Sequence, residues 1–294
     1  KVLKEKNSNK PWVEWPEELK NPSHQAKKHL SVLYDEELSH HMIIQFLCHL
    51  QLEQVKRYAD KHNIYLKGDL PILVSPDSAD VWANSEFFDL SQYVGSPPSR
   101  FDPEGQNWKF PCYKWPALEE NHFEWWRTRI DCFSRYFHMY RIDHILGFFR
   151  VWAIPKNGTP KEGFFIPKDE YLMQIQGKKL LSTLKSFSTM FPFGEDLGEV
   201  PDFIRTTMKE LGIPGIRIVP QNRRWKNDES YIPLEQYPQL SISTVSTHDT
   251  DPFRLWWIKN PKNAKEFCKF SDLKYRPVAT IDHLKANLKK IHSS

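Results

Sequence analysis

Apolar residues recur at helical spacing in two long parts of the chain. After Asp35 the first stripe consists of Leu38, Met42, Phe46 and Leu50, and the second consists of Phe123, Trp126, Ile130, Phe133 and Phe137. Steps of three and four residues place such side chains on one face of a helix. The sequence therefore predicts two amphipathic helices here, and it predicts further helices around residues 169–189, 201–211 and 279–291.

Short apolar runs between the helical segments indicate strands. They lie near residues 64–69, 139–143, 191–195, 215–219 and 242–247. Alternation of helices with short strands is typical of a parallel sheet whose strands are joined by helical crossovers. The pattern therefore predicts an α/β fold.

Two stretches lack a clear period. Residues 1–34 are polar and contain prolines, which indicates a loop or an approach segment. Residues 76–118 are rich in proline, glycine and aromatic residues, and a connection of that length inside a compact domain is usually functional. We therefore expect a long functional loop at 76–118.

Four of the predicted strands end in an acidic residue. Asp69 follows "IYLKG", Asp143 follows "YRI", Glu195 follows "FPFG" and Asp249 follows "STVSTH". In a barrel of eight parallel strands the carboxyl ends of the strands meet on one face, where active sites lie. Each acid could instead cap the helix after its strand. Four such acids together favour a shared pocket over four separate caps.

The stretch "YRIDHILGFFRVW" (140–152) places three titratable side chains directly before an apolar run, with His144 following Asp143. Side chains two apart on a strand point the same way, so Arg141 and Asp143 share a face. An adjacent guanidinium favours the ionised carboxylate and lowers its pKa. These properties suit a nucleophile that must stay anionic near neutral pH.

A second carboxyl group stands in a different setting. Glu195 ends an apolar strand, where burial could raise its pKa and make it a proton donor. Two carboxyl groups whose pKa values are pushed apart are the arrangement that glycoside chemistry needs. The residues alone leave open whether Glu195 or Asp196 is the acid.

Composition and charge narrow the function classes. The 294-residue chain is 39% hydrophobic, 14% aromatic and 27% charged, as is typical of a soluble globular protein. Its net charge is +4 and its basic residues are scattered, which argues against nucleic acid as the main partner. No apolar run is long enough to span a membrane and no apolar signal region stands at the start, so we expect no membrane association.

Cysteine and histidine spacing predicts no metal site. The four cysteines have no metal-type spacing, and His40, His41 and His49 lack an accompanying pattern of carboxylates or cysteines. Such cysteine usage indicates a reduced, cytoplasmic protein. The sequence contains no glycine-rich phosphate loop and no serine or cysteine nucleophile motif, so we expect no cofactor.

Several motifs carry a family resemblance. In order and spacing, "YRIDHILGFF", "FGEDLG" and "STHDT" resemble the signature regions of 4-alpha-glucanotransferases (amylomaltase or disproportionating enzyme, glycoside hydrolase family 77). "KGDLPILVSPDSADVW" is similar to an upstream barrel strand of that family, and "GSPPSRFDPEGQNW" is similar to its substrate-binding loop. Together the motifs span residues 64–258. One departure is "HDTD", where many members have "HDNDT", which puts only contacts next to the aspartate in doubt.

The resemblance implies roles for the acids. Asp143 would be the nucleophile that forms a covalent glucosyl–enzyme intermediate, and Glu195 would be the acid/base. Asp249 would bind sugar hydroxyls and stabilise the transition state. A retaining double displacement of this kind needs its two central carboxyl groups roughly 5–5.5 Å apart.

The resemblance also implies substrate-binding residues. Arg141 and His248 would line the sugar site, and Asp69 would support the donor sugar. Trp108, with Gln106, would lie on the loop that receives the acceptor glucan. An aromatic, partly closed acceptor site would exclude water and so favour transfer over hydrolysis.

The function implied is that of a 4-alpha-glucanotransferase, which moves alpha-1,4-glucan segments between malto-oligosaccharides by a retaining double displacement. Its carbohydrate partners would be malto-oligosaccharides, maltose, glucose and glycogen- or starch-type glucans. One alternative is a hydrolase of the same glucans, which would differ only in the acceptor. Another is a non-catalytic glucan-binding remnant, although such a module has no need for both Asp143 and Glu195.

The family fold is a (β/α)8 TIM barrel, and about five of the eight strands are identifiable. We therefore expect residues 1–294 to be a fragment of a catalytic barrel domain, with 76–118 as a long substrate-binding loop insertion. An open barrel would expose strand edges and apolar faces. The 294 residues alone are accordingly expected to aggregate or to lack activity.

Overall fold

The structure is a computed structural model that describes residues 1–99, 102–198, 200–225 and 227–277. The chain forms two units, Lys1–Pro192 and Phe193–Ser294. Each unit is described by itself below.

Five short strands form a parallel sheet. They are β1 (Lys67–Leu70), β4 (Met139–Ile142), β7 (Phe191–Gly194), β8 (Gly215–Ile218) and β9 (Ser241–Thr244), in the order β1-β4-β7-β8-β9. β1 pairs parallel with β4, and β8 pairs parallel with β7 and with β9. The five strands and the α/β class predicted from the sequence are confirmed, with boundaries that differ by up to three residues.

Continuous burial explains why three of these strands could be predicted from their apolar runs. The last three residues of β4 and of β7 are buried, as are three of the four residues of β8. Strands that are covered on both faces are near-continuous apolar runs, and this is the usual state of parallel strands. The boundary between the two units falls within β7.

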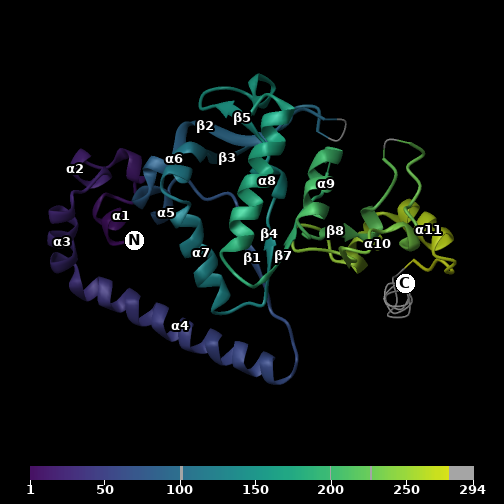
Figure 1. The fold of residues 1–294 in the computed structure, drawn as a ribbon, viewed down its shortest axis with the longest axis horizontal. Helices are drawn as coiled ribbons and strands as arrows, with labels where there is room; N and C mark the ends of the chain where they lie inside the picture. The colour runs from purple at the N-terminus through teal and green to yellow at the C-terminus, as the bar shows by residue number, and fades with distance from the viewer. Residues whose placement is uncertain (100–101, 199, 226, 278–294) are drawn as a thin grey trace. The chain divides into compact units, whose positions relative to one another are not determined.

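Three predicted crossover helices are also confirmed. They are α7 (Glu124–Ser134), α8 (Glu170–Ser186) and α9 (Asp202–Glu210) (Figure 1). α8 begins at an Asp169 side chain that accepts a hydrogen bond from Leu172 N at 3.0 Å, an ordinary N-cap. It approaches the segment after β4 closely, since a Cβ on Gly177 would lie 2.0 Å from the Phe149 ring.

The prediction that residues 76–118 form a loop is wrong. They contain α5 (Ala79–Ala83), β2 (Phe88–Ser96), β3 (Gln106–Tyr113) and α6 (Trp115–Glu120), with the 3-10 turn Ser85–Phe87 between α5 and β2. β2 and β3 join β5 (Val151–Pro155) and β6 (Phe164–Ile166) in an antiparallel sheet of order β3-β2-β5-β6. The β2–β3 register shifts twice, so the strands lack the regular alternation by which a sequence shows a half-buried strand.

The prediction that residues 1–34 form a loop is also wrong. This segment contains α1 (Val2–Lys6), the 3-10 turn Trp12–Glu14, α2 (Glu17–Lys20) and α3 (His24–Leu33). Distant contacts hold it: Trp12 Nε1 donates to the carbonyl oxygen of Pro76 at 2.7 Å, and Trp12 N donates to Asp77 Oδ1 at 3.1 Å. Such short helices depend on tertiary contacts, because isolated helices of this length are marginal.

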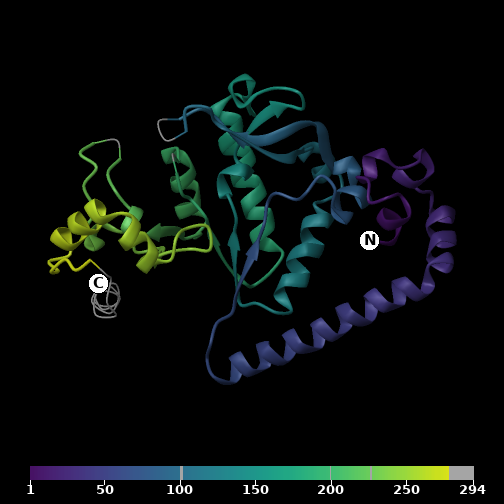
Figure 2. The ribbon, with the colours of Figure 1, turned by 180° about the vertical axis from the view of Figure 1, so that it is seen from behind.

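The first predicted amphipathic helix is α4 (Asp35–Lys61), which runs along one edge of the first unit (Figures 1 and 2). Its apolar stripe is largely exposed, with Met42 70%, Phe46 58% and Val55 51% exposed. The spacing of apolar residues therefore predicted the helix correctly, although few of those side chains are covered.

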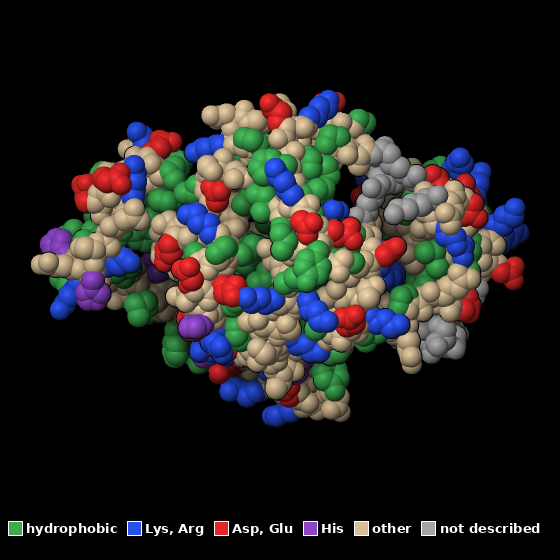
Figure 3. Space-filling model, turned by 45° about the horizontal axis from the view of Figure 1, so that its top comes forward, with side chains coloured by type: hydrophobic (Ala, Val, Ile, Leu, Met, Phe, Trp, Pro, Cys, Tyr) green, Lys and Arg blue, Asp and Glu red, His purple; other side chains and the backbone are tan. Residues whose placement is uncertain are grey.

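The second unit has its own aromatic core beyond the strands. α10 (Phe253–Lys259) and α11 (Pro261–Phe270) pack Phe253, Trp257 and Phe267 against Tyr231. The helix predicted at 279–291 lies outside the described residues. No described helix is both long and apolar enough to cross a membrane. On the face shown in Figure 3, basic and acidic side chains are interspersed.

Candidate active site

The end of β4 holds a buried arginine between two carboxylates. The Arg141 side chain is 4% exposed, and its Nη1 donates to Asp69 Oδ1 and Oδ2, each at 2.9 Å, and to Asp143 Oδ1 at 2.7 Å. Asp69 is the register partner of Arg141 on β1. The predicted shared face of Arg141 and Asp143 is confirmed, and one guanidinium stabilises two negative charges.

The two carboxylates occupy different positions relative to their strands. Asp143 directly follows β4, and its main-chain N donates to the carbonyl oxygen of Leu70 at 3.2 Å. Asp69 lies within β1, so its predicted place after the strand is corrected. Their side chains are 32% and 40% exposed, so both can reach a ligand from solvent.

His144 has an unusual backbone and a half-buried side chain. Its φ of 42° and ψ of 58° place it in the left-handed region, which few residues other than glycine adopt. Burial lowers the pKa of His144 to about 4, so the ring is neutral near pH 7. The Trp108 and His144 rings meet edge to face, with centroids 5.1 Å apart. No role for His144 was predicted from the sequence, where only its place directly after Asp143 indicates that it lies near the candidate site.

Gln106 and Trp108 belong to a strand rather than to a glycine-rich loop. Both lie in β3, which corrects their predicted setting. Trp108 Nε1 donates to Gln106 Oε1 at 2.8 Å, and Gln106 Nε2 donates to Asp102 Oδ2 at 3.0 Å. This row of side chains ends at His144, beside Asp143. Asp102 was not predicted from the sequence, because only its hydrogen bond with Gln106 in the structure connects it to this row.

In the second unit, Glu195 and Asp196 follow β7 and differ sharply in environment. Glu195 is half-buried, and its Oε1 accepts a hydrogen bond from Leu197 N at 3.3 Å. Asp196 is 1% exposed and forms ion pairs with Arg205 and Arg217 at 3.1 and 2.9 Å. The Asp196 side chain is thus enclosed between two guanidinium groups. Of the two acids, Glu195 is the more exposed.

His248 and Asp249 lie on an exposed turn of the second unit. Their side chains are 62% and 61% exposed, with His248 Nε2 3.2 Å from Asp249 Oδ2. β9 ends at Thr244, so Asp249 stands five residues beyond the strand and its predicted place at the strand end is corrected. The turn is closed by Thr247 N, which donates to Thr250 Oγ1 at 2.8 Å.

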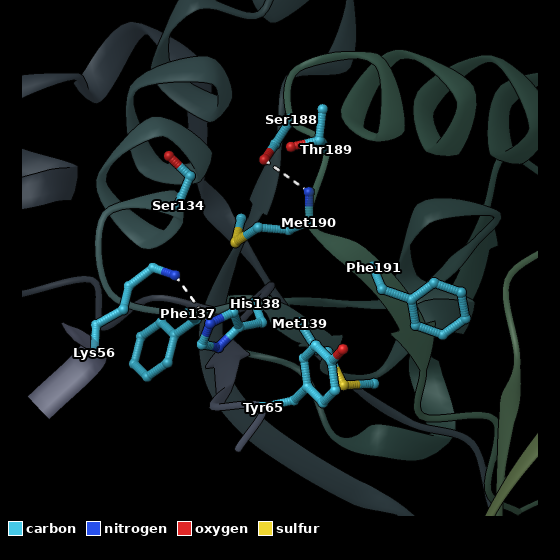
Figure 4. A pocket seen from close by; sticks show the side chains of 10 residues that line it. All are labelled: Lys56, Tyr65, Ser134, Phe137, His138, Met139, Ser188, Thr189, Met190 and Phe191. Atoms are coloured by element: carbon cyan, nitrogen blue, oxygen red, sulfur yellow. Dashed lines mark hydrogen bonds between the residues drawn. The ribbon is translucent and has the colours of Figure 1, made fainter. Parts of the chain in front are cut away.

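A cavity of about 500 Å³ in the first unit lies at the opposite edge of the sheet from Asp143. It is lined by Lys56, Tyr65, Ser134, Phe137, His138, Met139, Ser188, Thr189, Met190 and Phe191 (Figure 4). These residues lie at or before the first residues of β1, β4 and β7. Barrel active sites lie at the carboxyl ends of the strands, so this cavity is not the candidate active site.

Within the described ranges, no group of three histidine, cysteine, aspartate or glutamate residues could hold a metal ion. In the first unit the candidate residues are two carboxylates, an arginine, a neutral histidine and an aromatic ring. Parallel strands that alternate with helices, with Asp143 after β4 and Glu195 after β7, are typical of an α/β barrel fold.

Comparison with known proteins gives the family. Residues 1–292 match the glycoside hydrolase family 77 model, described as 4-alpha-glucanotransferase. The chain belongs to this family, as the motifs predicted.

Individual relatives agree with the family match. A 4-alpha-glucanotransferase of Chlamydia pneumoniae is 40% identical over 294 residues, which are 100% of this chain and 55% of the relative. The "4-alpha-glucanotransferase, chloroplastic/amyloplastic" of Solanum tuberosum is 32% identical over 272 residues, covering 86% of this chain and 44% of the relative. The chain thus spans about half the length of the curated relatives it matches.

A solved structure confirms the fold. The amylomaltase from Streptococcus agalactiae in complex with acarbose has a TM-score of 0.82 to this chain at 24% sequence identity. The match covers 99% of this chain and 59% of that chain. The parallel five-stranded sheet accordingly corresponds to part of an amylomaltase barrel.

Proposed function

We propose that the protein transfers alpha-1,4-glucan segments between malto-oligosaccharides through a covalent glucosyl–enzyme intermediate on Asp143. The observation that carries this proposal is the buried Arg141, which donates to both Asp69 and Asp143. A carboxylate held in this way is kept ionised and aimed, as a nucleophile requires. Family membership and the acarbose complex of the Streptococcus agalactiae relative support alpha-glucans as the substrate class.

In the first step, an Asp143 oxygen attacks the anomeric carbon and the bond to the leaving glucan breaks. Glu195 protonates the departing glycosidic oxygen. In the second step Glu195 removes a proton from the acceptor hydroxyl, which attacks the anomeric carbon and releases Asp143. Two inversions at one carbon retain the alpha configuration.

The remaining predicted residues serve binding in this proposal. Asp69 supports the donor sugar beside Asp143, and Arg141 holds both carboxylates. Asp249, with His248, binds sugar hydroxyls as positive charge develops in the transition state.

Trp108 and Gln106 receive the acceptor glucan. A tryptophan ring offers a large apolar face, and its edge-to-face contact with His144, the residue after Asp143, supports this role. Covering the intermediate in this way favours capture by a sugar hydroxyl over capture by water.

The proposal extends to the protein's organisation and setting. Residues 1–294 would act as one catalytic barrel domain in which 76–118 binds substrate, without a cofactor and in the cytoplasm. Partners would be malto-oligosaccharides, maltose, glucose and glycogen- or starch-type glucans. The plastid location named for the Solanum tuberosum relative is a property of that protein.

The test is the product ladder formed from maltotriose. Glucose together with oligosaccharides longer than maltotriose supports transfer. Glucose and maltose alone identify a hydrolase, and binding without products identifies a glucan-binding protein. Asp143→Asn is the matched control, because it keeps the size of the side chain and removes the nucleophilic charge.

A further inference from the structure

The second unit shows how the main chain around Glu195 is attached to β8. Gly194 pairs with Gly215, and Gly194 N donates to the carbonyl oxygen of Pro214 at 2.8 Å. Next along β8, Ile216 N donates to Asp196 Oδ1 at 2.8 Å. The Asp196 carboxylate thus reaches the main chain of β8 at the residue after Gly215. Glu195 lies between these two attachments.

Two arginines hold the same carboxylate from other directions. Arg217 Nη1 donates to both carboxylate oxygens of Asp196, each at 2.9 Å. Arg205, on α9, donates from Nε to Oδ2 at 3.1 Å and from Nη2 to the main-chain oxygen of Asp196 at 3.3 Å. Both the side chain and the backbone of Asp196 are therefore fixed.

Gly215 makes the close fit possible. A Cβ on this residue would lie 2.4 Å from Asp196 Oδ1 and 2.7 Å from both Cγ and Oδ2. Any residue larger than glycine would push the carboxylate away from Ile216 N. A glycine is thus required at position 215, because the Asp196 carboxylate lies so close to it.

We infer that Asp196 is a positioning residue that fixes the place of the Glu195 carboxyl group. The inference rests on the proposed function, in which Glu195 protonates the leaving oxygen. A general acid works only within hydrogen-bond reach of that oxygen. Asp196 itself is buried and touches no substrate, so it acts through the backbone that it shares with Glu195.

The test compares two donors in Asp196→Asn. Asparagine keeps an acceptor for Ile216 N but lacks the charge that holds Arg205 and Arg217. With maltotriose we expect turnover to fall by about 100-fold, the usual cost of misplacing a catalytic group by about 1 Å. With alpha-maltosyl fluoride as donor and azide as acceptor, neither step needs proton transfer, and we expect a loss below about threefold.

A second test variant and a control variant complete the experiment. Gly215→Ala displaces the same carboxylate from the opposite side, so it should show the same selective loss, and it decides the question if Asp196→Asn does not fold. Asp251→Asn is the matched control, because it removes a charge from the ion pair with Lys259, 3.0 Å away, in the same unit. It should leave both activities unchanged.

Each outcome is decisive. Selective loss with maltotriose in Asp196→Asn or Gly215→Ala supports the inference, whereas equal loss with both donors, or no loss, overturns it and leaves the proposed function intact. If the unmodified protein uses neither donor, the proposed function fails and this inference falls with it.

Discussion

Among the described residues, two charged side chains are almost completely buried, Arg141 at 4% and Asp196 at 1% exposure. Their charges are opposite. At the end of β4 a buried cation holds two half-exposed carboxylates. At the end of β7 a buried anion holds two arginines. Each buried charge stands within two residues of a proposed catalytic acid.

The difference matches the two proposed roles. Asp143 itself takes part in the ion pair with Arg141, which suits a nucleophile that stays ionised. At the second strand end Asp196, the residue after Glu195, pairs with Arg205 and Arg217. The main chain beside the proposed acid/base is thereby fixed by a buried neighbour.

The largest expected effect comes from removing the nucleophile. Asp143→Asn should lower turnover of maltotriose by at least about 1,000-fold, because no covalent intermediate can form. Steady-state release of glucose measures the effect. The variant should not regain transfer with alpha-maltosyl fluoride, because a donor that needs no protonation still needs the nucleophile. Retention of more than about a hundredth of the turnover would contradict the assignment.

The next effect compares the arginines at the two strand ends. Arg141→Lys should lower turnover by about 10- to 100-fold with both donors, because a lysine ammonium cannot reproduce the guanidinium contacts to Asp69 and Asp143. Arg217→Lys should lower turnover with maltotriose only. If the two variants respond alike to the change of donor, the contrast between the two strand ends is wrong.

A smaller effect is expected at the acceptor residue. Trp108→Ala should raise the ratio of hydrolysis to transfer several-fold, because water then reaches the intermediate more readily. Chromatography of the maltotriose products gives this ratio. Trp108→Phe keeps an aromatic ring against His144 and should change the ratio less. An equal change in both variants would mean that the aromatic ring does not control the ratio.

The smallest effect concerns stability in acid. The pKa of His144 is about 4 in the folded protein and near 6.5 in the unfolded chain. Between these values only the unfolded chain binds the proton, so the free energy of unfolding falls as pH decreases, by up to about 1.4 kcal/mol per pH unit. Above pH 6.5 the His144 ring is neutral in both the folded and the unfolded chain, so it no longer makes stability depend on pH.

Urea unfolding at pH 7, 6 and 5 measures that dependence. His144→Asn, a replacement that tolerates the left-handed backbone, should show a shallower fall in stability across the same range. Identical slopes in both proteins would mean that His144 titrates normally when folded.

The strands of the parallel sheet were easiest to predict where burial is continuous. β4, β7 and β8 are buried along most of their length, and their apolar runs showed them. β2 and β3 were missed because register shifts interrupt the alternation of their side chains and because Pro111 lies within β3. The N-terminal helices were missed because contacts such as Trp12 with Pro76 hold them.

The candidate site was likewise predictable from the sequence only in part. The strand period alone placed Arg141 and Asp143 on one face. The partnership of Asp69 with Arg141 depends on the register between β1 and β4, which no local pattern encodes. The choice between Glu195 and Asp196 likewise required Arg205 and Arg217, which are 9 and 21 positions from Asp196.

By itself, the sequence determined the α/β class, the five parallel strands and the family, because these depend on periodicities and motifs within short windows. Only the tertiary structure decided that a buried Arg141 serves two carboxylates and that a buried Asp196 binds two arginines. It also decided that Trp108 meets His144 from a strand. Burial and charge pairing arise between residues distant in the chain, and the free energy that holds these groups in place exists only once the strands have come together.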